Sequence, residues 1–402
     1  MNAETRGQLR RLSVLIAIAL VDMIGFAIIF PILPFYVLDL KATPFTVGVI
    51  TAAFSAAQIL SAPIWGRVSD RYGRRPALLI GLLASSVAYV VFGLADAVWL
   101  LLLSRVIQGA GGGTTGVAQA YITDSVEPAN RARALGWLSA ATSAGVMIGP
   151  VLGSVAAHWG RAAPGFLAAA LCVVNALFAW RWLPESRPVH EGPPKVRRPI
   201  WHAAWHVLRH PSEPAPRMIW IYGVGMLAFS ALTSVLALFL GARFGVTATS
   251  IGPYFLYVGG LSVVLRSLLL GPIVDRIGET WAMRTGALAL VVGLLLYPLA
   301  SSITILLCIM PLVPIGTALL FPATTSLIAS HTDPGEIGTV MGVAQTWAGM
   351  ARVIAPLFAT AAFERAVWMP FVLGAAIVAV VTVLAFRVPV VPPRHKRAPV
   401  AA

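Results

Sequence analysis

Long apolar segments separated by short polar stretches make up most of this chain. Each is about as long as the ~20 apolar residues with which an α-helix crosses the hydrocarbon core of a bilayer. Strands of membrane barrels alternate apolar and polar residues over about ten positions, and these segments are too long and too continuous for that. The pattern predicts an all-α polytopic membrane protein with twelve spanning helices, at residues 12–38, 46–65, 77–95, 98–121, 134–157, 163–183, 218–240, 248–271, 282–300, 303–329, 337–362 and 367–388.

One long polar stretch, residues 184–216, separates the sixth apolar segment from the seventh. It contains eight prolines, a composition typical of a linker. Within it, apolar residues recur at helical spacing over 200–210, which predicts a short helix at the membrane interface. We therefore expect three parts: an N-terminal six-helix half, 1–183, the cytoplasmic linker, and a C-terminal six-helix half, 217–402.

The two halves carry related sequences. Residues 66–73 read GRVSDRYG and residues 271–278 read GPIVDRIG, so Gly, Asp, Arg and Gly recur 205 positions later. Pro150 in the fifth span and Pro356 in the eleventh lie 206 positions apart. These matches predict two six-helix pseudo-repeats. Parallel repeats of this kind place the substrate site between the halves, near the middle of the bilayer.

Composition and charge agree with this interpretation. Hydrophobic residues make up 58% of the chain and charged residues 11%, against about a quarter charged in a soluble domain. With the N-terminus inside, 22 of the 29 Lys and Arg fall in cytoplasmic segments, four in outer segments and three within spans. The net charge of +14 therefore indicates a topology with both termini in the cytoplasm. It also predicts attraction to membrane lipids, and it does not indicate nucleic acid binding.

The sequence contains no pattern typical of a cofactor, a metal or nucleotide hydrolysis. The two cysteines lack any CxxC or Cys/His spacing. His202, His206 and His210 lie four residues apart, but no carboxylate or thiol is near them. No GxxxxGK[ST] occurs, which excludes ATP hydrolysis as the direct drive. We expect no enzyme activity, no cofactor and no metal.

Four ionisable side chains fall deep within the predicted spans. Asp22 is the only deep one of the 15 acidic residues, and the deep cations are Arg105, Arg266 and Arg352. Placing a charged group at membrane depth costs free energy, so such a residue is first interpreted as part of a functional site. Because burial and a nearby cation set a carboxyl group's affinity for protons, Asp22 with Arg105 is our candidate for proton coupling. The alternative is a structural polar contact between helices.

Four motifs occur in chain order: Asp22-x-x-Gly25-x5-Pro31-x-x-Pro34, Gly66-x-x-x-Asp70-Arg71-x-Gly73-Arg74-Arg75, Arg105-x-x-Gln108-Gly109 and Gly145-x-x-x-Gly149-Pro150-x-x-Gly153. With them, the chain resembles the major facilitator superfamily over nearly its whole length. The first of these motifs looks like the first-helix pattern of the twelve-helix drug/proton antiporters, which include the tetracycline exporters. This implies a monomer in the bacterial cytoplasmic membrane that works by alternating access.

The resemblance implies a conformational latch on the inner face. Asp70 would meet the inner end of the eleventh helix, where a carboxylate is favoured by unpaired N–H groups and the helix dipole. Glycines would allow the tight turn of the 66–75 loop. The alternative is that these arginines only obey the positive-inside rule. The candidate latch residues are Gly66, Asp70, Arg71, Gly73, Arg74, Arg75, Asp124 and, in the second copy, Asp275.

In the fifth helix, Gly145, Gly149 and Gly153 recur every four residues and form one face of small residues, next to Pro150. Such faces let helix backbones approach closely. The resemblance implies that this face packs against the opposite half and limits ion leak. Generic close packing of helices is the alternative.

Candidate substrate-binding residues lie on spans expected to line the cavity. They combine apolar walls with a few polar anchors, which suits a small amphipathic substrate better than a sugar. Tetracycline exporters commonly carry a histidine where this chain has Ser262, so the substrate stays open. The candidates are Phe26, Phe30, Phe54, Gln58, Gln119, Tyr257, Ser262, Arg266, Gln345 and Arg352.

The favoured function is therefore a secondary exporter that exchanges amphipathic drugs for protons. A metabolite or sugar exporter of the same fold is one alternative. A non-transporting membrane sensor or a lipid-handling protein is an alternative of another class.

Overall fold

The computed structural model describes residues 3–186, 213–333 and 336–390, with Trp205, Val207 and Arg209 of the linker. These residues form helices, turns and loops and contain no strand, which confirms the all-α prediction. Eleven helical segments among them are long and apolar enough to cross a membrane. The chain divides into two compact units, Met1–Pro194 with Gly245–Gly259, and Lys195–Phe244 with Gly260–Ala402.

The helices of the first half are α1 (Ala3–Ile29), α2 (Leu33–Asp39), α3 (Pro44–Tyr72), α4 (Arg74–Gly93), α5 (Val98–Gly111), α6 (Thr114–Ser125), α7 (Pro128–Ala157) and α8 (Ala163–Trp182). Those of the second half are α10 (Pro214–Phe244), α11 (Gly252–Val264), the π-helix η1 (Leu265–Leu269), α12 (Leu270–Ile277), α13 (Glu279–Leu296), the 3₁₀ helix η2 (Tyr297–Leu299), α14 (Ile303–Ile309), α15 (Leu312–Ser330), α16 (Ile337–Arg365) and α17 (Met369–Phe386).

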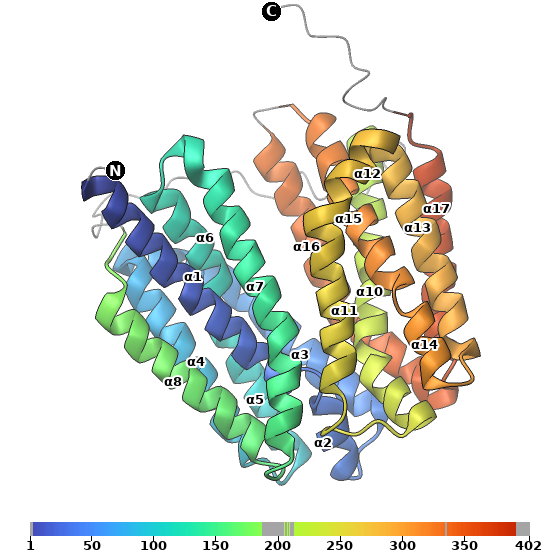
Figure 1. Cartoon of the computed structure of the whole chain (residues 1–402), viewed down its shortest axis with the longest axis horizontal. Coiled ribbons are helices and arrows are strands. Elements are labelled where there is room, and N and C mark those ends of the chain that lie inside the picture. Colours follow the sequence, from blue (N-terminus) through green and yellow to red (C-terminus); the bar gives the residue numbers. More distant parts are fainter. Residues whose placement is uncertain are drawn as a thin grey trace, which may run out of the picture. The chain divides into compact units, whose positions relative to one another are not determined.

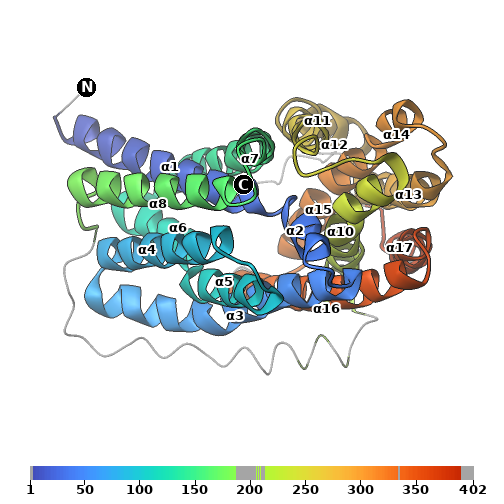
Figure 2. The same cartoon turned by 90° about the horizontal axis from the view of Figure 1, so that it is seen from below.

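The two units pack their helices by the same scheme. In the first, α1 packs on α7 and α8, and α4 packs on α5 and α8. In the second, α10 packs on α16 and α17, and α13 packs on α15 and α17. Within the first unit, α4 and α8 run side by side in both views (Figure 1 and Figure 2). The six-helix pseudo-repeats predicted from the sequence are confirmed.

A pair of glycines marks the same helix crossing in each unit. A Cβ on Gly81 of α4 would lie 3.0 Å from the carbonyl oxygen of Gly111 in α5. A Cβ on Gly286 of α13 would lie 2.8 Å from the carbonyl oxygen of Gly316 in α15. Both members of the pair recur 205 positions later, the same interval as the sequence repeat. Since only glycine leaves room for backbones this close, the crossing is a shared feature of the two repeats.

The fourth span is broken, whereas the sequence predicted one continuous helix over 98–121. Gly112 and Gly113 separate α5 from α6 and interrupt the regular backbone hydrogen bonds of the helix. Side chains of α3 bond to three carbonyls at this break: Ser61 Oγ donates to Gly109 at 3.2 Å, Trp65 Nε1 to Ala110 at 2.5 Å, and Gln58 Nε2 to Gly112 at 3.5 Å. Irregular backbone at membrane depth is tolerated where protein groups satisfy it in this way.

The segment expected to be a loop at 66–75 is mostly helix. The α3 helix continues to Tyr72, and Gly73 alone separates it from α4, with φ of +102°. The expectation that both glycines form a tight turn is therefore wrong for Gly66, which lies within α3. The second unit repeats the arrangement, because Gly278 between α12 and α13 has φ of +83° while Gly271 is helical.

The C-terminal end of the linker packs on the second unit. Val207 is buried, and its carbonyl oxygen accepts a hydrogen bond from Trp220 Nε1 of α10 at 3.2 Å. Trp205 is 54% exposed and lies under the guanidinium of Arg209. The rest of the predicted interfacial helix, with its three histidines, lies outside the described residues, and the predicted boundaries at 183 and 217 stay a prediction.

Gly73 and Gly66 give a matched pair of substitutions. Gly73→Ala should lower stability by about 1 kcal/mol or more, because alanine disfavours positive φ and its Cβ would lie 2.5 Å from Glu185 Oε2. Gly66→Ala should leave stability unchanged or raise it, since nothing lies within 4 Å of an added Cβ on that helical residue. The measurement is thermal unfolding of the purified protein in detergent. Equal effects of the two substitutions would contradict the assigned turn.

Candidate functional site

Asp22 lies in the middle of its span and is held by the broken fourth span. The hydroxyl of Thr114, the first residue of α6, donates to Asp22 Oδ2 at 2.9 Å. The carboxylate borders a cavity of about 10 Å³ lined by residues of α1, α4, α6 and α7, among them Leu78, Leu82 and Leu138. That volume is about the space that one water molecule occupies. Thr114 was missed by the sequence analysis because the helix break was not foreseen.

Arg105 is buried against aromatic rings. Its guanidinium carbon lies 5.7 Å from the ring centre of Tyr89 and 5.2 Å from that of Phe92. Its Nη2 donates to Ser104 Oγ at 3.1 Å, and neither described ion pair includes it. Tyr89 interacts electrostatically with both Arg105 and Asp22. Tyr89, which lies under the guanidinium of Arg105, was not selected by the sequence analysis.

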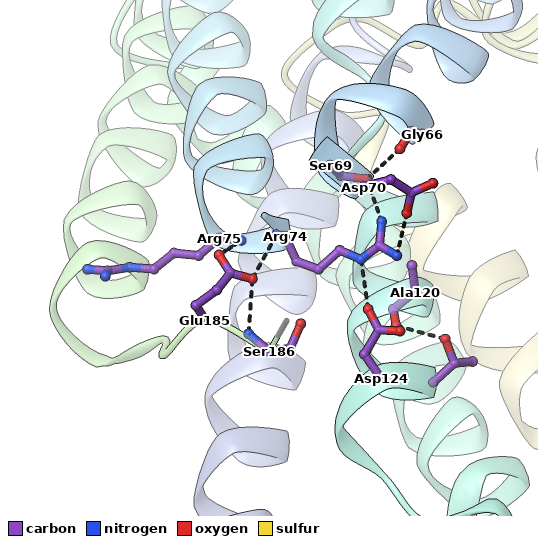
Figure 3. Close-up of polar contacts among 10 residues, drawn as sticks. Gly66, Ser69, Asp70, Arg74, Arg75, Ala120, Asp124, Glu185 and Ser186 are labelled. Atoms are coloured by element: carbon purple, nitrogen blue, oxygen red, sulfur yellow. Dashed lines mark hydrogen bonds and ion pairs between the residues drawn. The ribbon is translucent and has the colours of Figure 1, made fainter. Parts of the chain in front are cut away.

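Three of the candidate latch residues come together at one end of the first unit (Figure 3). Arg74 is nearly buried, and its guanidinium forms ion pairs with Asp70 at 2.7 Å and Asp124 at 2.9 Å. Its Nη1 also donates to Ser69 Oγ at 2.6 Å. The cluster ties the end of α3 to the end of α6 through the first residue of α4. Asp70 is half-exposed, with 50% of its side chain accessible.

Glu185, which falls in the stretch assigned to the linker, completes this region. One carboxylate oxygen accepts from the backbone N–H of Arg74 at 2.8 Å and the other from that of Arg75 at 3.0 Å (Figure 3). The carboxylate after α8 thereby satisfies unpaired N–H groups at the start of α4, where the helix dipole favours a negative charge. No local spacing signals this cap, since 111 residues separate Glu185 from Arg74.

The remaining latch candidates lie elsewhere. The guanidinium of Arg71 lies over the ring of its neighbour Tyr72, and Arg75 Nη2 donates to the carbonyl of Trp180. In the second unit, Asp275 lies in α12, and Glu279 occupies the position 205 residues after Arg74. Glu279 is buried and accepts from Ser326 Oγ at 2.8 Å. The second copy therefore lacks the arginine that organises the first.

The glycine face of α7 packs against α1, which corrects the expectation that it meets the opposite half. An added Cβ would lie 2.7 Å from the carbonyl oxygen of Leu20 at Gly145, 2.5 Å from Ala27 Cβ at Gly149, and 2.5 Å from the carbonyl oxygen of Ile28 at Gly153. The closest approach of small residues therefore stabilises the first unit internally. Spacing predicts a close contact but cannot name the helix on its other side.

A different face of α7 meets segment 245–259, which belongs to the same unit. Ser154 Oγ accepts from the backbone N–H of Gly252, the first residue of α11, at 2.7 Å. A Cβ on Gly252 would lie 2.9 Å from the carbonyl oxygen of Pro150. The predicted Pro150 thus lies in a tight contact, on a side of α7 that the glycines do not use.

The structure groups some of the candidate substrate residues. In the first unit, the ring of Phe26 lies 6.0 Å from that of Phe30 and 5.4 Å from that of Phe54. Gln58 bonds to the fourth-span break, and Gln119 is exposed on α6. The three phenylalanines thus form one aromatic group.

In the second unit, Gln345 Nε2 donates to the hydroxyl of Tyr222 at 3.4 Å, and Arg266 interacts electrostatically with Tyr222. Arg352 Nε donates to the carbonyl of Ala348 in its own helix at 3.3 Å. Ser262 lies in the part of α11 that belongs to this unit, whereas Tyr257, also on α11, belongs to the first unit. Tyr222 joins two of the candidates and was missed, because a single tyrosine in an apolar span carries no distinguishing pattern.

Comparison with known proteins identifies related sequences. The family model described as Major Facilitator Superfamily matches residues 15–356 and 263–402. The chain is 28% identical over 375 residues to the class C tetracycline resistance protein of Escherichia coli, covering 91% of this chain and 94% of that protein. It is 28% identical over 364 residues to multidrug resistance protein 2 of Bacillus subtilis, covering 89% and 90%.

Solved structures share the fold. The human organic anion transporter MFSD10 superposes with a TM-score of 0.69 at 23% identity, covering 96% of this chain and all of that one. A bacterial homologue of the human lysosomal transporter Spinster, in an inward-facing state, superposes with a TM-score of 0.79 at 16% identity, covering 96% and 97%. At these identities the comparison supports the fold.

The α1–α7 contact predicts unequal effects of two glycine substitutions in one helix. Gly149→Ala should destabilise the first unit, because the new Cβ would overlap Ala27 and overpacking typically costs about 1–3 kcal/mol. Gly136→Ala should be tolerated, since nothing lies within 4 Å of a Cβ there. Thermal unfolding in detergent measures both. Wild-type stability of Gly149→Ala would disprove the contact.

Proposed function

Because this chain belongs to the Major Facilitator Superfamily and is a multi-pass membrane transporter, we propose that it exports amphipathic drugs in exchange for protons. The two six-helix repeats would alternate access to a central site. The proposal places the chain in a bacterial cytoplasmic membrane as a monomer, with both termini in the cytoplasm. Its partners would be the substrate, protons and membrane lipids.

The observation that carries the proposal is the setting of Asp22. Among the described spans it is the one carboxylate at mid-membrane depth, twelfth of the 29 residues in the span Arg11–Asp39. Thr114 orients it, and the cavity beside it has room for a water molecule that could deliver a proton. A group in this position can change its charge during the transport cycle, which is the requirement for coupling.

The relatives support the export of drugs, since two of them are named for resistance to tetracycline and to multiple drugs. The aromatic group of Phe26, Phe30 and Phe54 would supply an apolar wall for such compounds. Gln58, Gln119, Tyr257, Ser262 and Gln345 would supply polar anchors. This composition suits amphipathic molecules better than sugars.

The Arg74 cluster would act as the conformational latch. Arg74 already fixes Asp70 at the end of α3 and is backed by Asp124 and Ser69. We propose that Asp70 thereby presents its remaining oxygen to the start of the eleventh span in the outward-open state. Gly73 and Glu185 would keep the start of α4 in place while the latch opens and closes.

Asp22→Asn should abolish pH-gradient-driven accumulation, because asparagine keeps the shape but cannot bind and release a proton. Each unit of pH gradient supplies about 1.4 kcal/mol per proton, which an uncoupled variant cannot use. The assay is flux into proteoliposomes, with and without a pH gradient, of the compound most strongly exported in a drug-susceptibility panel.

Thr114→Val should weaken the coupling because it removes the hydroxyl bonded to Asp22. Thr123→Val is the control, since the Thr123 hydroxyl bonds only to a carbonyl of its own helix. Uphill transport by Asp22→Asn with the wild-type pH dependence would assign coupling to another residue.

Asp70→Asn should cut transport severely while the protein still reaches the membrane, because the latch loses its charge. Asp275→Asn should cost less, because Glu279 stands where the first copy has Arg74. Transport rates normalised to the amount of protein in the membrane test both. Normal transport by Asp70→Asn would remove the latch from the mechanism.

A further inference from the structure

Positive charge predominates in the middle of the described spans. Arg105, Arg266 and Arg352 lie there, against Asp22 alone. The second unit has two of these arginines and no carboxylate at that depth among its described residues. Its described acidic side chains all lie near helix ends or in connections, at Glu213, Asp275, Glu279, Asp333, Glu336 and Glu364. An arginine kept at membrane depth without a carboxylate needs another explanation.

Arg266 differs from the other two in what surrounds its guanidinium. Arg105 is covered by aromatic rings, and Arg352 bonds to a carbonyl of its own helix. Within the described part of its own unit, Arg266 forms neither a hydrogen bond nor an ion pair, and the residue is exposed by its solvent-accessible surface. Its five N–H donors are therefore available to a ligand.

The backbone around Arg266 is unusual as well. Residue 266 is the fifteenth of 26 in the span Gly252–Ile277 and lies in the π-helical turn η1, which packs against α15. Single π-helical turns inside α-helices are rare and occur frequently at functional sites. The second repeat thus has a distorted turn at the depth where parallel repeats hold their substrate.

The groups beside Arg266 complete a site. The turn that carries Arg266 packs against α15, which carries Phe321, and the Tyr222 hydroxyl of α10 accepts from Gln345 of α16 at 3.4 Å, which leaves the phenol hydrogen free to donate. The ring of Phe321 meets that of Tyr222 edge to face, with centres 5.6 Å apart. A cation, a hydroxyl donor and two aromatic rings are thus contributed by three spans, and Gln345 of a fourth bonds to the hydroxyl.

We propose that this cluster binds the acidic group of the substrate, and that the exported compounds are amphipathic organic anions, in particular aryl carboxylates. Guanidinium matches a carboxylate with two parallel hydrogen bonds, and the hydroxyl of Tyr222 adds a third. The two rings contact the apolar body of the ligand. A cationic drug would meet Arg266 with no carboxylate of this unit to offset the repulsion. This inference rests on the proposed export function and narrows its substrate class.

The charge of the substrate changes the energetics of exchange. An anion that leaves and a proton that enters both carry positive charge inward, so an interior-negative membrane potential drives both movements. One-for-one exchange of a monovalent cation for a proton would move no net charge. For one-for-one exchange, dependence of export on membrane potential therefore distinguishes an anionic substrate from a monovalent cationic one.

The binding test uses three probes of one shape: 2-naphthoate, 2-naphthamide and 2-naphthylmethylamine, the last cationic at neutral pH. Wild-type protein in detergent should bind the naphthoate tightest. Arg266→Gln should weaken naphthoate binding by about tenfold or more, as loss of hydrogen bonds to a charged group does, and leave naphthamide binding unchanged. Arg266→Lys should retain part of the affinity, and Tyr222→Phe should cause a smaller loss.

Arg365→Gln is the matched control. It removes the same charge from the same unit, but at the end of α16 rather than in the middle of a span. It should leave all three affinities as they are in the wild type. Tightest binding of the amine, or an equal loss of all three probes in Arg266→Gln, would overturn the anion site.

Flux in proteoliposomes separates this inference from the proposed function. Export of naphthoate that rises with an imposed interior-negative potential, and is lost in Arg266→Gln, supports both. Selective naphthoate binding without movement of any probe would support the site and contradict export. Export of the amine but not of the naphthoate would support export and overturn the anion site.

Discussion

Every backbone N–H and C=O group in the spanning segments must find a partner within the protein, because the bilayer core contains no water to bind them. This constraint explains why the described chain is helical almost throughout, and why each departure from the α-helix matters. At the Gly112–Gly113 break, Ser61, Trp65 and Gln58 of α3 donate hydrogen bonds to backbone carbonyls. The break in turn places Thr114 against Asp22. The setting of the candidate coupling carboxylate therefore depends also on the side chains of α3.

Charged side chains in the spans also need partners within the protein, because little water reaches them. Arg74 is shared between Asp70 and Asp124, and Arg105 is covered by the faces of Tyr89 and Phe92. These are two ways of stabilising a cation away from water, by opposite charge and by aromatic quadrupoles. Within its own described unit, Arg266 has neither an ion pair nor an aromatic ring over its guanidinium. This difference is why we propose that an anionic ligand binds in the second repeat.

Close helix contacts decide where these groups can lie. The Gly81–Gly111 and Gly286–Gly316 crossings hold the same helices together in each repeat, and the glycine face of α7 holds α1. Because α1 carries Asp22, the α1–α7 contact also positions the carboxylate. The repeats share this packing but not their charges, since Glu279 stands where the first repeat has Arg74. A common scaffold therefore supports two different sets of polar groups.

The sequence by itself determined the features that depend on local composition. Continuous apolar segments located the spans, the 205-residue interval indicated the repeat, and the four motifs indicated the family. Asp22 was selected because a charge deep in an apolar segment is conspicuous, and Asp70 and Arg74 were selected through the repeated motif and the resemblance it carries.

Tertiary structure alone decided the partners. Glu185 caps a helix that begins 111 residues earlier, Tyr222 joins Arg266 to Gln345, and the glycines of α7 meet α1 rather than the opposite half. Spacing along one helix shows which residues share a face, but not which helix that face meets. That choice is made by packing between segments far apart in the chain, where no periodic pattern of the sequence records it.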